Sequence, residues 1–489
     1  MKKNRNMKKW MFIIASFYSI SLFSQNEVDA LRYSTINYGG TSRFMTMGSS
    51  FGALGGDVSA ISVNPASLGI YRSSELTITP YFSYNQSSAQ YLGSTLDDYK
   101  FRFQMGNVGA VATHLNGKDE GWVSVSMALS YNRINDFGNY IKIQGYNNTS
   151  SMTDYFASLA NGHNYENFDY FNEGLAWDSY LIDPDTSATN KYKTTFPNYG
   201  EMQEKDINTR GGMGEYEFAI GGNYENKLYL GMSLGIETIR YKESSEYSEI
   251  DTKDTIPSFN YFNFKKELKT YGSGFNFKFG LIYRPLDWFR VGLALHTPTF
   301  FNLSDTYSSS MQSSFDDTLH GDGHVINSPA GNYDYELTTP FRAVASAGVL
   351  INKIVALSVE YEFVDYSMAR LRANDYFFRD ENDAIEESYR AVGIIRAGAE
   401  YRTGPISFRC GYGFYPSPFK SGLANEDANK SIYSLGIGIK GDDTYFDLGF
   451  TYSTMKEKYF LYDNAVIANT PATITHNNVG LIATFGVKF

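Results

Sequence analysis

Along most of the chain, hydrophobic and polar residues alternate with a period of two, which is the period of a β-strand. Residues 122–132 read WVSVSMALSYN, and Val123, Val125, Met127, Leu129 and Tyr131 fall on one face of the predicted strand. Small polar residues, mostly serines, fall on the other face. A continuous apolar face opposite a small polar one is typical of strands with lipid outside and a polar lumen inside.

The same alternation recurs in about fourteen segments, so the predicted fold class is all-β, a transmembrane antiparallel β-barrel. No blade-length repeat indicates a soluble β-propeller instead. The segments lie near residues 76–84, 101–114, 121–146, 214–224, 227–244, 262–284, 288–300, 335–351, 354–371, 389–403, 405–416, 430–440, 443–456 and 472–489.

The connections between these segments alternate between tight and long. The tight ones carry turn residues, as at Asn116-Gly117 and Gly441-Asp442. The long ones are expected near residues 85–100, 147–213, 245–261, 301–334, 372–388, 417–429 and 457–471. Short turns at one end and long loops at the other are typical of outer-membrane barrels. An even strand number places both ends of the barrel on the short-turn, periplasmic side.

The first 24 residues have the layout of a secretory signal peptide. Five basic residues precede a short apolar stretch over 11–23, which is too short to span a bilayer. We expect cleavage near Ser24 and Gln25, and no cysteine lies there to carry a lipid anchor. No later apolar run is long enough for a transmembrane helix, yet the chain contains 40 Tyr and 36 Phe. An exported, aromatic-rich chain of this kind suggests the Gram-negative outer membrane.

Charge and motifs exclude several other functions. The net charge of −11 becomes more acidic once the basic leader is removed, which argues against nucleic acid as a partner. The single cysteine, Cys410, permits no intramolecular disulfide. No nucleophile elbow or other catalytic constellation is present, so we expect no enzyme activity and no cofactor. His320 and His324 share a Gly-containing loop, where a metal or haem site remains an alternative to a solvated loop.

Residues 25–75 do not alternate. They are rich in glycine and contain the stretch GGDVSAISVNPASLG over 55–69. A phosphate-binding loop is excluded because no lysine follows the glycines and Pro65 interrupts any long helix. The segment is therefore either a periplasmic tail or a plug inside the lumen, where small residues allow close backbone packing.

Three stretches together resemble the FadL/TodX family of outer-membrane channels for long-chain fatty acids and other hydrophobic compounds. The first is the Gly-rich segment with Asp57, Asn64-Pro65-Ala66 and Leu68-Gly69. The others are the hairpin over 272–298, with its Arg284-Pro285 turn, and the hairpin over 395–418. The resemblance covers essentially the whole chain after residue 24.

The resemblance implies a monomeric barrel over 76–489, plugged by an N-terminal hatch over 25–75. A hydrophobic ligand would meet a groove among extracellular loops and then a pocket inside the barrel. Hatch movement and a lateral opening in the wall would release it into the membrane without an energy source. On this interpretation the gate consists of Gly55, Gly56, Asp57, Asn64, Pro65 and Ala66. Asp57 and Asn64 either tie the plug to the wall or cap local structure.

Two groups of residues are candidates for ligand binding. Lys278, Arg396 and Arg409 lie on predicted lumen faces, where they either pair with wall carboxylates or meet a ligand carboxylate. The long loops 147–213 and 301–334 are the expected extracellular surface. The first carries Phe168, Tyr170, Phe171 and Trp177, which either form a ligand groove or pack together or against a partner.

A second function remains open at this point. A FadL-like barrel could serve as a subunit or adaptor of an outer-membrane protein secretion or assembly complex, holding a protein partner instead of a lipid. An unselective porin is a third possibility, against which the predicted hatch argues.

Overall fold

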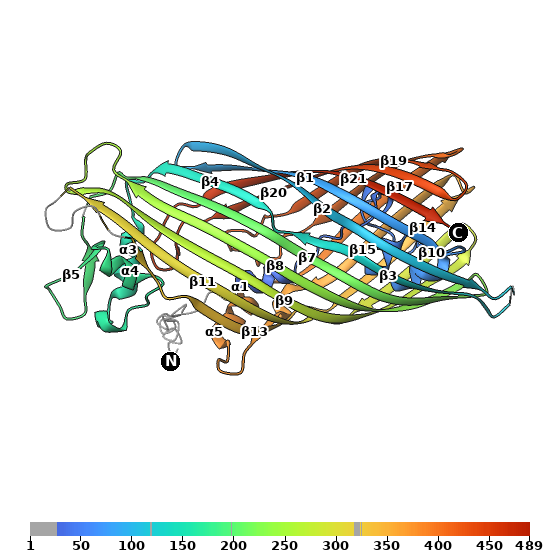
Figure 1. The fold of residues 1–489 in the computed structure, drawn as a ribbon, viewed down its shortest axis with the longest axis horizontal. Coiled ribbons are helices and arrows are strands. Elements are labelled where there is room, and N and C mark those ends of the chain that lie inside the picture. The colour runs from blue at the N-terminus through green and yellow to red at the C-terminus, as the bar shows by residue number, and fades with distance from the viewer. Residues whose placement is uncertain (1–26, 118–119, 197, 317–322, 324) are drawn as a thin grey trace, which may run out of the picture.

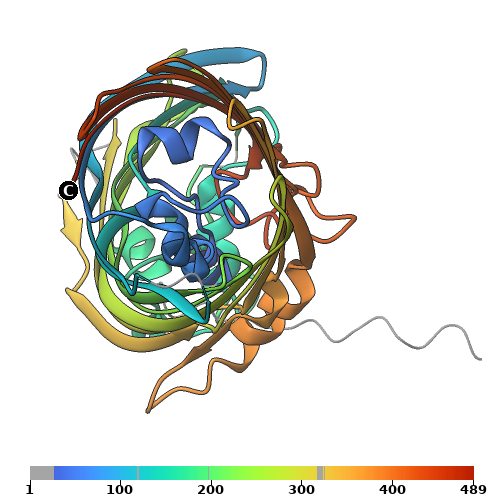
Figure 2. The same cartoon turned by 90° about the vertical axis from the view of Figure 1, so that its right-hand side faces the viewer.

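The wall of the protein is a single antiparallel sheet that closes around a lumen (Figures 1 and 2). The architecture is that of a computed structural model, which describes residues 27–117, 120–196, 198–316, 323 and 325–489. β1 (Glu75–Tyr91) pairs with β2 (Ser94–Leu115) on one side and with β21 (Ala472–Lys488) on the other, so the sheet closes. The predicted fold class is confirmed: the wall is a closed 14-strand antiparallel β-barrel.

Some of the 14 wall positions hold two consecutive strands, because the chain breaks partway up the wall. The broken positions are β3 (Trp122–Asp136) with β4 (Asn139–Tyr146), β10 (Phe289–His296) with β11 (Phe300–Phe315), β13 (Gly331–Thr338) with β14 (Arg342–Ile351), and β15 (Val355–Asp365) with β16 (Arg370–Arg372). The unbroken strands besides β1, β2 and β21 are β7 (Met202–Tyr224), β8 (Leu228–Ile250), β9 (Phe259–Leu286), β17 (Ala391–Thr403), β18 (Ile406–Tyr415), β19 (Lys430–Lys440) and β20 (Thr444–Tyr459). The short β12 (Ile326–Asn327) pairs with β11.

The alternation along the strands separates the outer surface from the lumen as predicted. On β3, Met127 and Leu129 are exposed on the outside, whereas Ser124, Ser126 and Ser130 are buried. The remaining strands follow the same rule, and Cys410 of β18 is exposed on the outer face. No helix among the described residues is long and apolar enough to cross a membrane.

The exposed apolar side chains form a belt around the barrel. On β8 and β9 the belt includes Met232, Ile236, Phe275 and Phe279, and it ends near Tyr271. Beyond Tyr271 the outward positions of these strands are mainly polar or charged. β9 has 28 residues, far more than the roughly 9–11 that cross a bilayer. The strands therefore extend well beyond the membrane on the loop side, and Figure 1 shows these long strands continuing towards the end of the barrel where α3 and α4 lie.

This extension corrects the predicted loops. Residues 85–100, expected as a loop, complete a β1–β2 hairpin that turns at Leu92 and Gly93, with φ of 45° and 88°. The predicted loop 301–334 is largely strand, because β11 reaches Phe315 and β13 begins at Gly331. The predicted loop 147–213 ends earlier, where β7 begins at Met202. Outside the membrane neither face of a strand meets lipid, so the alternation fades and the sequence underestimates strand length.

Residues 27–71 lie inside the barrel, and we call them the lumen segment. They contain α1 (Glu27–Ser34), α2 (Ser42–Thr46) and two 3-10 helices, η1 (Val58–Ser62) and η2 (Pro65–Ile70). Figure 2 shows these elements, in blue, within the ring of strands. Nearly every residue from Gly40 to Gly69 is buried, so the lumen segment fills the barrel at this level.

The connection between β4 and β7 forms a small subdomain, the cap, at the end of the barrel opposite the C-terminus (Figure 1). Its elements are α3 (Met152–Ala160), η3 (Tyr165–Asn167), α4 (Glu173–Asp178), β5 (Ile182–Pro184) and β6 (Tyr192–Thr194). Ser151 and Asp154 form a capping box that fixes the start of α3.

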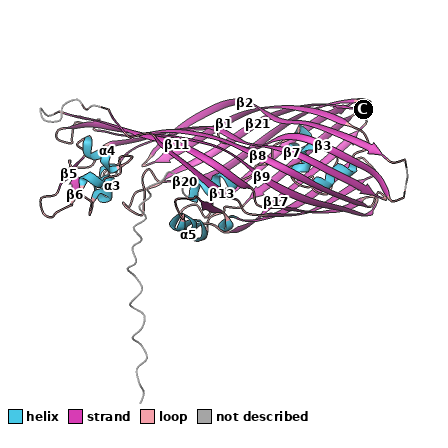
Figure 3. Cartoon of the chain, turned by 60° about the horizontal axis from the view of Figure 1, so that its bottom comes forward, coloured by secondary structure: helices cyan, strands magenta, loops and turns pink. Residues whose placement is uncertain are grey.

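A second excursion, the α5 segment (Tyr366–Arg390), projects sideways from the barrel (Figure 3). It comprises η4 (Tyr366–Met368), β16 and α5 (Arg379–Ser388). The segment leaves the wall at the top of β15 and returns at the start of β17.

Candidate functional site

The lumen segment is tied to the wall through buried carboxylates. Glu217, Glu360 and Glu400 lie on different strands, and each is at most 4% exposed. Their donors are Ser62 Oγ at 2.7 Å, the Gly52 amide at 2.9 Å and Arg43 Nε at 2.9 Å, respectively. Hydrogen bonds to buried charged groups are stronger than neutral ones, so these contacts fix the segment's position in the lumen.

Asp57, one of the predicted gate residues, acts within the lumen segment. Its carboxylate caps η1 by accepting from the Ser59 amide at 3.0 Å, and it accepts from the Thr41 hydroxyl at 2.8 Å. Burial raises the pKa of the Asp57 carboxyl to about 6, although nearby Arg43 acts to lower it. Asp57 therefore joins two turns of the segment to each other.

Gly55 and Gly56 form the turn that leads into η1. Both have positive φ, 60° and 70°, a region that favours glycine. The Gly56 amide donates to Ser67 O at 3.3 Å, so the turn folds back onto η2. The two glycines serve the internal shape of the lumen segment.

Asn64 links the lumen segment both to itself and to the wall. Its side chain accepts from the Ala66 amide at 3.0 Å, which caps η2. Its amide group donates to Gly52 O at 2.7 Å and to Leu281 O of β9 at 3.3 Å. Asn64 therefore does both things that the sequence allowed: it caps local structure, and it ties the lumen segment to the wall.

Glycines of the wall leave room for η2 to pack closely against three strands, a feature that the sequence pattern did not reveal. Gly221, Gly231 and Gly280 lie directly opposite one another on β7, β8 and β9. A methyl group on Gly231 or Gly280 would overlap the backbone at Pro65 and Ala66. The signal was present as glycine on the lumen face of three adjacent strands, but only the strand register shows that they form one track.

Each predicted lumen cation lies between two buried wall carboxylates. The shortest nitrogen–oxygen distances are 2.7 and 3.0 Å for Lys278 to Glu215 and Glu217, 2.5 and 2.7 Å for Arg396 to Glu360 and Glu362, and 2.7 and 2.6 Å for Arg409 to Glu400 and Asp447. The charge of each cation is thus already compensated by the protein.

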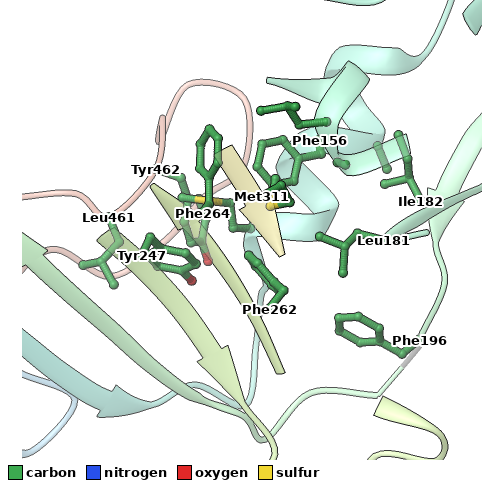
Figure 4. Close-up of a cluster of buried hydrophobic side chains, with 14 of the residues drawn as sticks. Phe156, Leu181, Ile182, Phe196, Tyr247, Phe262, Phe264, Met311, Leu461 and Tyr462 are labelled. Atoms are coloured by element: carbon green, nitrogen blue, oxygen red, sulfur yellow. The ribbon is translucent and has the colours of Figure 1, made fainter. Parts of the chain in front are cut away.

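The cap has a hydrophobic core of its own, shared with the strands beneath it (Figure 4). Phe156 of α3 meets Phe264 of β9 edge to face, with ring centroids 5.3 Å apart. Leu181 and Met311 are fully buried in the same cluster. Much of the aromatic content of the cap therefore stabilises the cap itself.

The four aromatic residues that were predicted to form a ligand groove lie in different surroundings. Phe168 is 5% exposed and packs edge-on against Trp177, with centroids 6.1 Å apart. Phe171 lies 4.9 Å from the Tyr307 ring of β11. Tyr170 is 47% exposed and remains available on the outer surface of the cap. The four residues therefore do not share one surface.

The ladder between β2 and β3 stops partway up the wall. Its last pair is Asn107 with Asn132, and the part of β2 before Asn107 pairs only with β1. β3 ends at Asp136, and β4, which follows a two-residue break, pairs only with β7. We call the boundary between β2 and β3–β4 above Asn107 the seam.

Side chains, not backbone ladders, close the seam. Arg102 of β2 forms an ion pair with Asp136 of β3. Lys100 of β2 donates to Asn208 Oδ1 of β7 at 2.7 Å. The remaining contacts across the seam include Gln104 Nε2 to Asp136 Oδ2 at 3.0 Å and Lys100 Nζ to Asn139 O at 3.3 Å. A boundary of this kind separates without breaking a continuous strand pair.

A cavity of about 140 Å³ lies beside the seam, between the wall and the lumen segment. Its lining mixes aromatic and apolar groups with polar ones: Tyr38, Met45, Tyr81, Gln104, Arg133, Asp136, Tyr415, Lys430 and Ile432 among others. Lys430 Nζ donates to Asn37 Oδ1 at 2.8 Å, and Arg133 donates to Gly211 O at 2.9 Å. Within the described chain neither cation forms an ion pair, so an incoming anion would find both available.

Histidines provide no metal site in the part of the chain that is described. No group of three or more His, Cys, Asp or Glu side chains there could hold a metal ion. His296 lies in the lumen and contacts Val63 O at 2.8 Å through Nε2. His320 and His324 lie outside the described residues.

A closed barrel with an outer apolar belt, a filled lumen and extended loop-side strands defines an outer-membrane β-barrel. The chain belongs to the outer membrane protein transport protein (OMPP1/FadL/TodX) family, whose model matches residues 24–489. The family consists of outer-membrane channels for hydrophobic compounds, not of enzymes, and this chain is a channel of that kind.

Solved structures share this fold. A FadL homologue from Pseudomonas aeruginosa aligns over 93% of this chain and 100% of its own, with a TM-score of 0.55 and 10% identity. The toluene transporter TodX from Pseudomonas putida aligns over 93% of this chain and 100% of its own, with a TM-score of 0.53 and 11% identity. At these identities the likeness shows the fold alone. The curated proteins contain no sequence match.

Proposed function

We propose that the protein lets hydrophobic molecules with an acidic head group, of the long-chain fatty-acid type, diffuse passively through the outer membrane. The observation that carries this proposal is the cavity beside the seam. It combines aromatic walls with two cations, Arg133 and Lys430, that have only neutral acceptors. A carboxylate would neutralise them, while an apolar tail would contact Tyr81 and Ile432.

In the proposed route, the ligand is first captured at exposed aromatics of the cap such as Tyr170. It then reaches the cavity and leaves sideways through the seam, where only side chains join β2 to β3 and β4. Because the lumen segment fills the barrel, it acts as a hatch that must shift for passage. The moving part would be the turn at Gly55–Asp57 and the Asn64–Ala66 step.

The structure suggests a different role for the cations first considered for ligand binding. Lys278, Arg396 and Arg409 are held by carboxylates that also bind the lumen segment. We propose that these networks position the hatch, and that head-group recognition belongs to Arg133 and Lys430. A ligand carboxylate would otherwise have to displace two protein carboxylates at once.

A binding measurement tests the proposal. We expect the purified protein in mild detergent to bind a fluorescent long-chain fatty acid, and Lys430→Met to weaken binding about tenfold, since a hydrogen bond to a charged group contributes about 1.5 kcal/mol. Lys456→Met is the matched control, because Lys456 lies exposed on β20. Equal affinity of the two variants would contradict the head-group assignment.

Mass spectrometry of the protein with its co-purified molecules tests the transport role itself. We expect an enriched hydrophobic acid. A stoichiometric protein partner without any enriched hydrophobe would contradict transport and support a subunit of a secretion or assembly complex.

We also propose that residues 1–24, which lie outside the described residues, are a signal peptide removed during export. Intact-mass analysis of protein from the outer membrane should give a chain that begins at Gln25. Recovery of the uncleaved chain in the outer membrane would contradict this.

A further inference from the structure

The barrel wall has a second place without a strand ladder, far around the barrel from the seam. The last pair between β15 and β17 is Asp365 with Ala391. Above it, the three-residue β16 pairs only with β13 on one edge. The chain then runs through α5 before it returns to the wall at β17, and Figure 3 shows α5 on the outside of the barrel.

One side chain takes the place of the missing strand. Asn382 of α5 donates through Nδ2 to Leu371 O at 2.9 Å and accepts from the Leu371 amide at 2.8 Å. These are the two hydrogen bonds that a neighbouring strand would make with Leu371. Asn382 thus fastens the helix to the open edge of the wall, beside an ion pair at 3.5 Å between Arg370 of β16 and Glu386 of α5.

Apolar side chains continue from the outer surface to the lumen beneath this fastening. Phe377, at the tip of the segment, is 95% exposed, and Met368 is 47% exposed. Directly behind them, Phe378, Leu371 and Ile385 are fully buried in one cluster. The cluster continues into the lumen, where it includes Ala30 and Tyr33 of α1 and Phe301, Leu303 and Tyr335 of the wall.

The outer end of this apolar path adjoins the lipid belt. Tyr361 of β15 and Ile395 of β17 are exposed on the outer face, a few residues below the last ladder pair. A molecule dissolved in the outer leaflet would therefore meet the α5 segment at the edge of the membrane. The exposed Phe377 extends the apolar surface past the belt.

The lumen end of the path is occupied by α1. Tyr389, where the α5 segment rejoins the wall, donates to Glu27 O at 3.1 Å, and Arg342 donates to Ser34 O. Tyr33 meets the Tyr241 ring edge to face at 6.3 Å. Ala30 and Tyr33 fill apolar space that a hydrophobic ligand would use.

The α5 segment also contains a strained residue. Phe378, immediately before α5, has a φ of 48°, which is unfavourable for a bulky side chain. Its ring is held between Tyr376 and Tyr335, with centroids at 4.9 and 6.3 Å. Strain that packing maintains is relieved when the packing opens, which lowers the cost of moving the segment.

We propose that the α5 segment is a side door through which hydrophobic molecules dissolved in the outer leaflet enter the barrel. The molecule passes beneath α5 into the apolar cluster and displaces α1 towards the lumen. This inference rests on the proposed function as a hydrophobe channel. It adds an entrance within the membrane to the exit at the seam.

Cross-linking tests the door. In a Cys410→Ser background, Arg370→Cys and Glu386→Cys, whose native side chains form an exposed ion pair at 3.5 Å between β16 and α5, are joined by a short bismaleimide in proteoliposomes whose outer leaflet contains a fluorescent fatty acid. We expect cross-linking to reduce protein-dependent uptake to the level of protein-free vesicles. The matched control is Lys142→Cys with Asp206→Cys. This pair is also an exposed ion pair, at 3.7 Å, and it joins β4 and β7 where they are already paired.

Unchanged uptake after complete cross-linking would overturn the door and leave the proposed channel intact. Absence of uptake from the leaflet before cross-linking would also overturn the door, and only a failure to bind the fatty acid in detergent would overturn the channel with it.

A second variant makes the opposite prediction. Asn382→Ala removes the fastening, so uptake should be faster and hydrogen exchange in residues 366–390 should increase. Asn116→Ala, which loses a bond to Trp122 O at 2.7 Å in the tight turn between β2 and β3, should leave uptake unchanged. Equal uptake by Asn382→Ala and wild type would overturn the door.

Discussion

Arg43 makes a forked, charge-assisted contact between the lumen segment and the barrel wall. Its Nε and Nη2 atoms donate to the two oxygens of Glu400 at 2.9 and 3.2 Å. Charged hydrogen bonds of this kind contribute about 1.5–3 kcal/mol, and both groups are largely buried. Glu400 retains Arg409 as a partner when Arg43 is lost, so the barrel itself should still fold.

We therefore expect Arg43→Gln to raise the leak conductance in planar bilayers. A loss of about 2 kcal/mol corresponds to a roughly thirtyfold rise in the population of the displaced hatch. Arg402→Gln is the control, because Arg402 reaches the same Glu400 only at 3.5 Å and belongs to the wall. Equal leak through the two variants would show that the Arg43 contact does not hold the hatch.

Individual residue types were predictable from the sequence more readily than their partners. Asp57 and Asn64 stand before short helices, as expected of capping residues. Lys278, Arg396 and Arg409 were placed on lumen faces, but whether they pair with the wall or with a ligand depends on the strand register. Lys430 and Arg133 were missed because an unpaired cation is recognised only from its surroundings.

The glycine track on β7, β8 and β9 fixes how closely η2 approaches the wall. We expect Gly231→Ala to displace η2, because overpacking by one methyl group costs about 1–3 kcal/mol. Hydrogen exchange in residues 58–70 should increase while the barrel strands remain protected. Gly413→Ala is the control, since a methyl group there contacts only side chains at 3.1 Å or more. Identical exchange in the two variants would show that the glycines of β7, β8 and β9 do not determine the position of η2.

Two buried carboxylates lie at the base of the cap. Glu249 of β8 attaches α3 by accepting from the Met152 amide at 2.8 Å, and Glu201, which precedes β7, is fully buried. Burial, reinforced by Glu249, raises the pKa of Glu201 to about 8, and burial raises the pKa of Glu249 to about 7. The closed cap thus binds protons that an open, solvated cap releases.

The closed cap should therefore lose stability as the pH rises from about 5 to about 8. For each proton released, the ratio of closed to open cap should fall by up to about tenfold per pH unit. Protection factors of α3 amides, corrected for intrinsic exchange, measure this. Glu201→Gln should flatten the pH dependence, whereas Glu204→Gln, on a half-buried outward position of β7, should not. A steep dependence that persists in Glu201→Gln would assign it to other groups.

Strand centres were predictable and strand ends were not. The serine-rich half of β11, from Ser304 to Ser314, contains no apolar–polar alternation. It is held as a strand by pairing with β9, which no local pattern encodes. The length of the two strands matters for function, because their extensions support the cap.

At the scale of the whole molecule, lipid on the outside and a polar lumen determine the architecture. This boundary acts on every strand, so the sequence predicted the barrel and its 14 wall positions. The boundary between lipid and lumen does not determine the seam or the α5 segment, where regular strand pairing stops. The alternation could not reveal either site, because the sequences of the strands on both sides of each break still read as ordinary strands.

Lateral release is the decisive step of the proposed transport: hydrophobic molecules leave the barrel sideways through the seam. The most direct test measures transfer of a fluorescent long-chain fatty acid into the bilayer of proteoliposomes. Gln104→Cys of β2 and Asp136→Cys of β3, whose native side chains lie 3.0 Å apart across the seam, are joined in a Cys410→Ser background. The control joins Thr113→Cys to Ser126→Cys, where β2 and β3 are already paired.

We expect that closing the seam abolishes transfer, that reducing the cross-link restores it, and that the control pair has no effect. Transfer at the same rate with the seam fully cross-linked would contradict lateral release at this site.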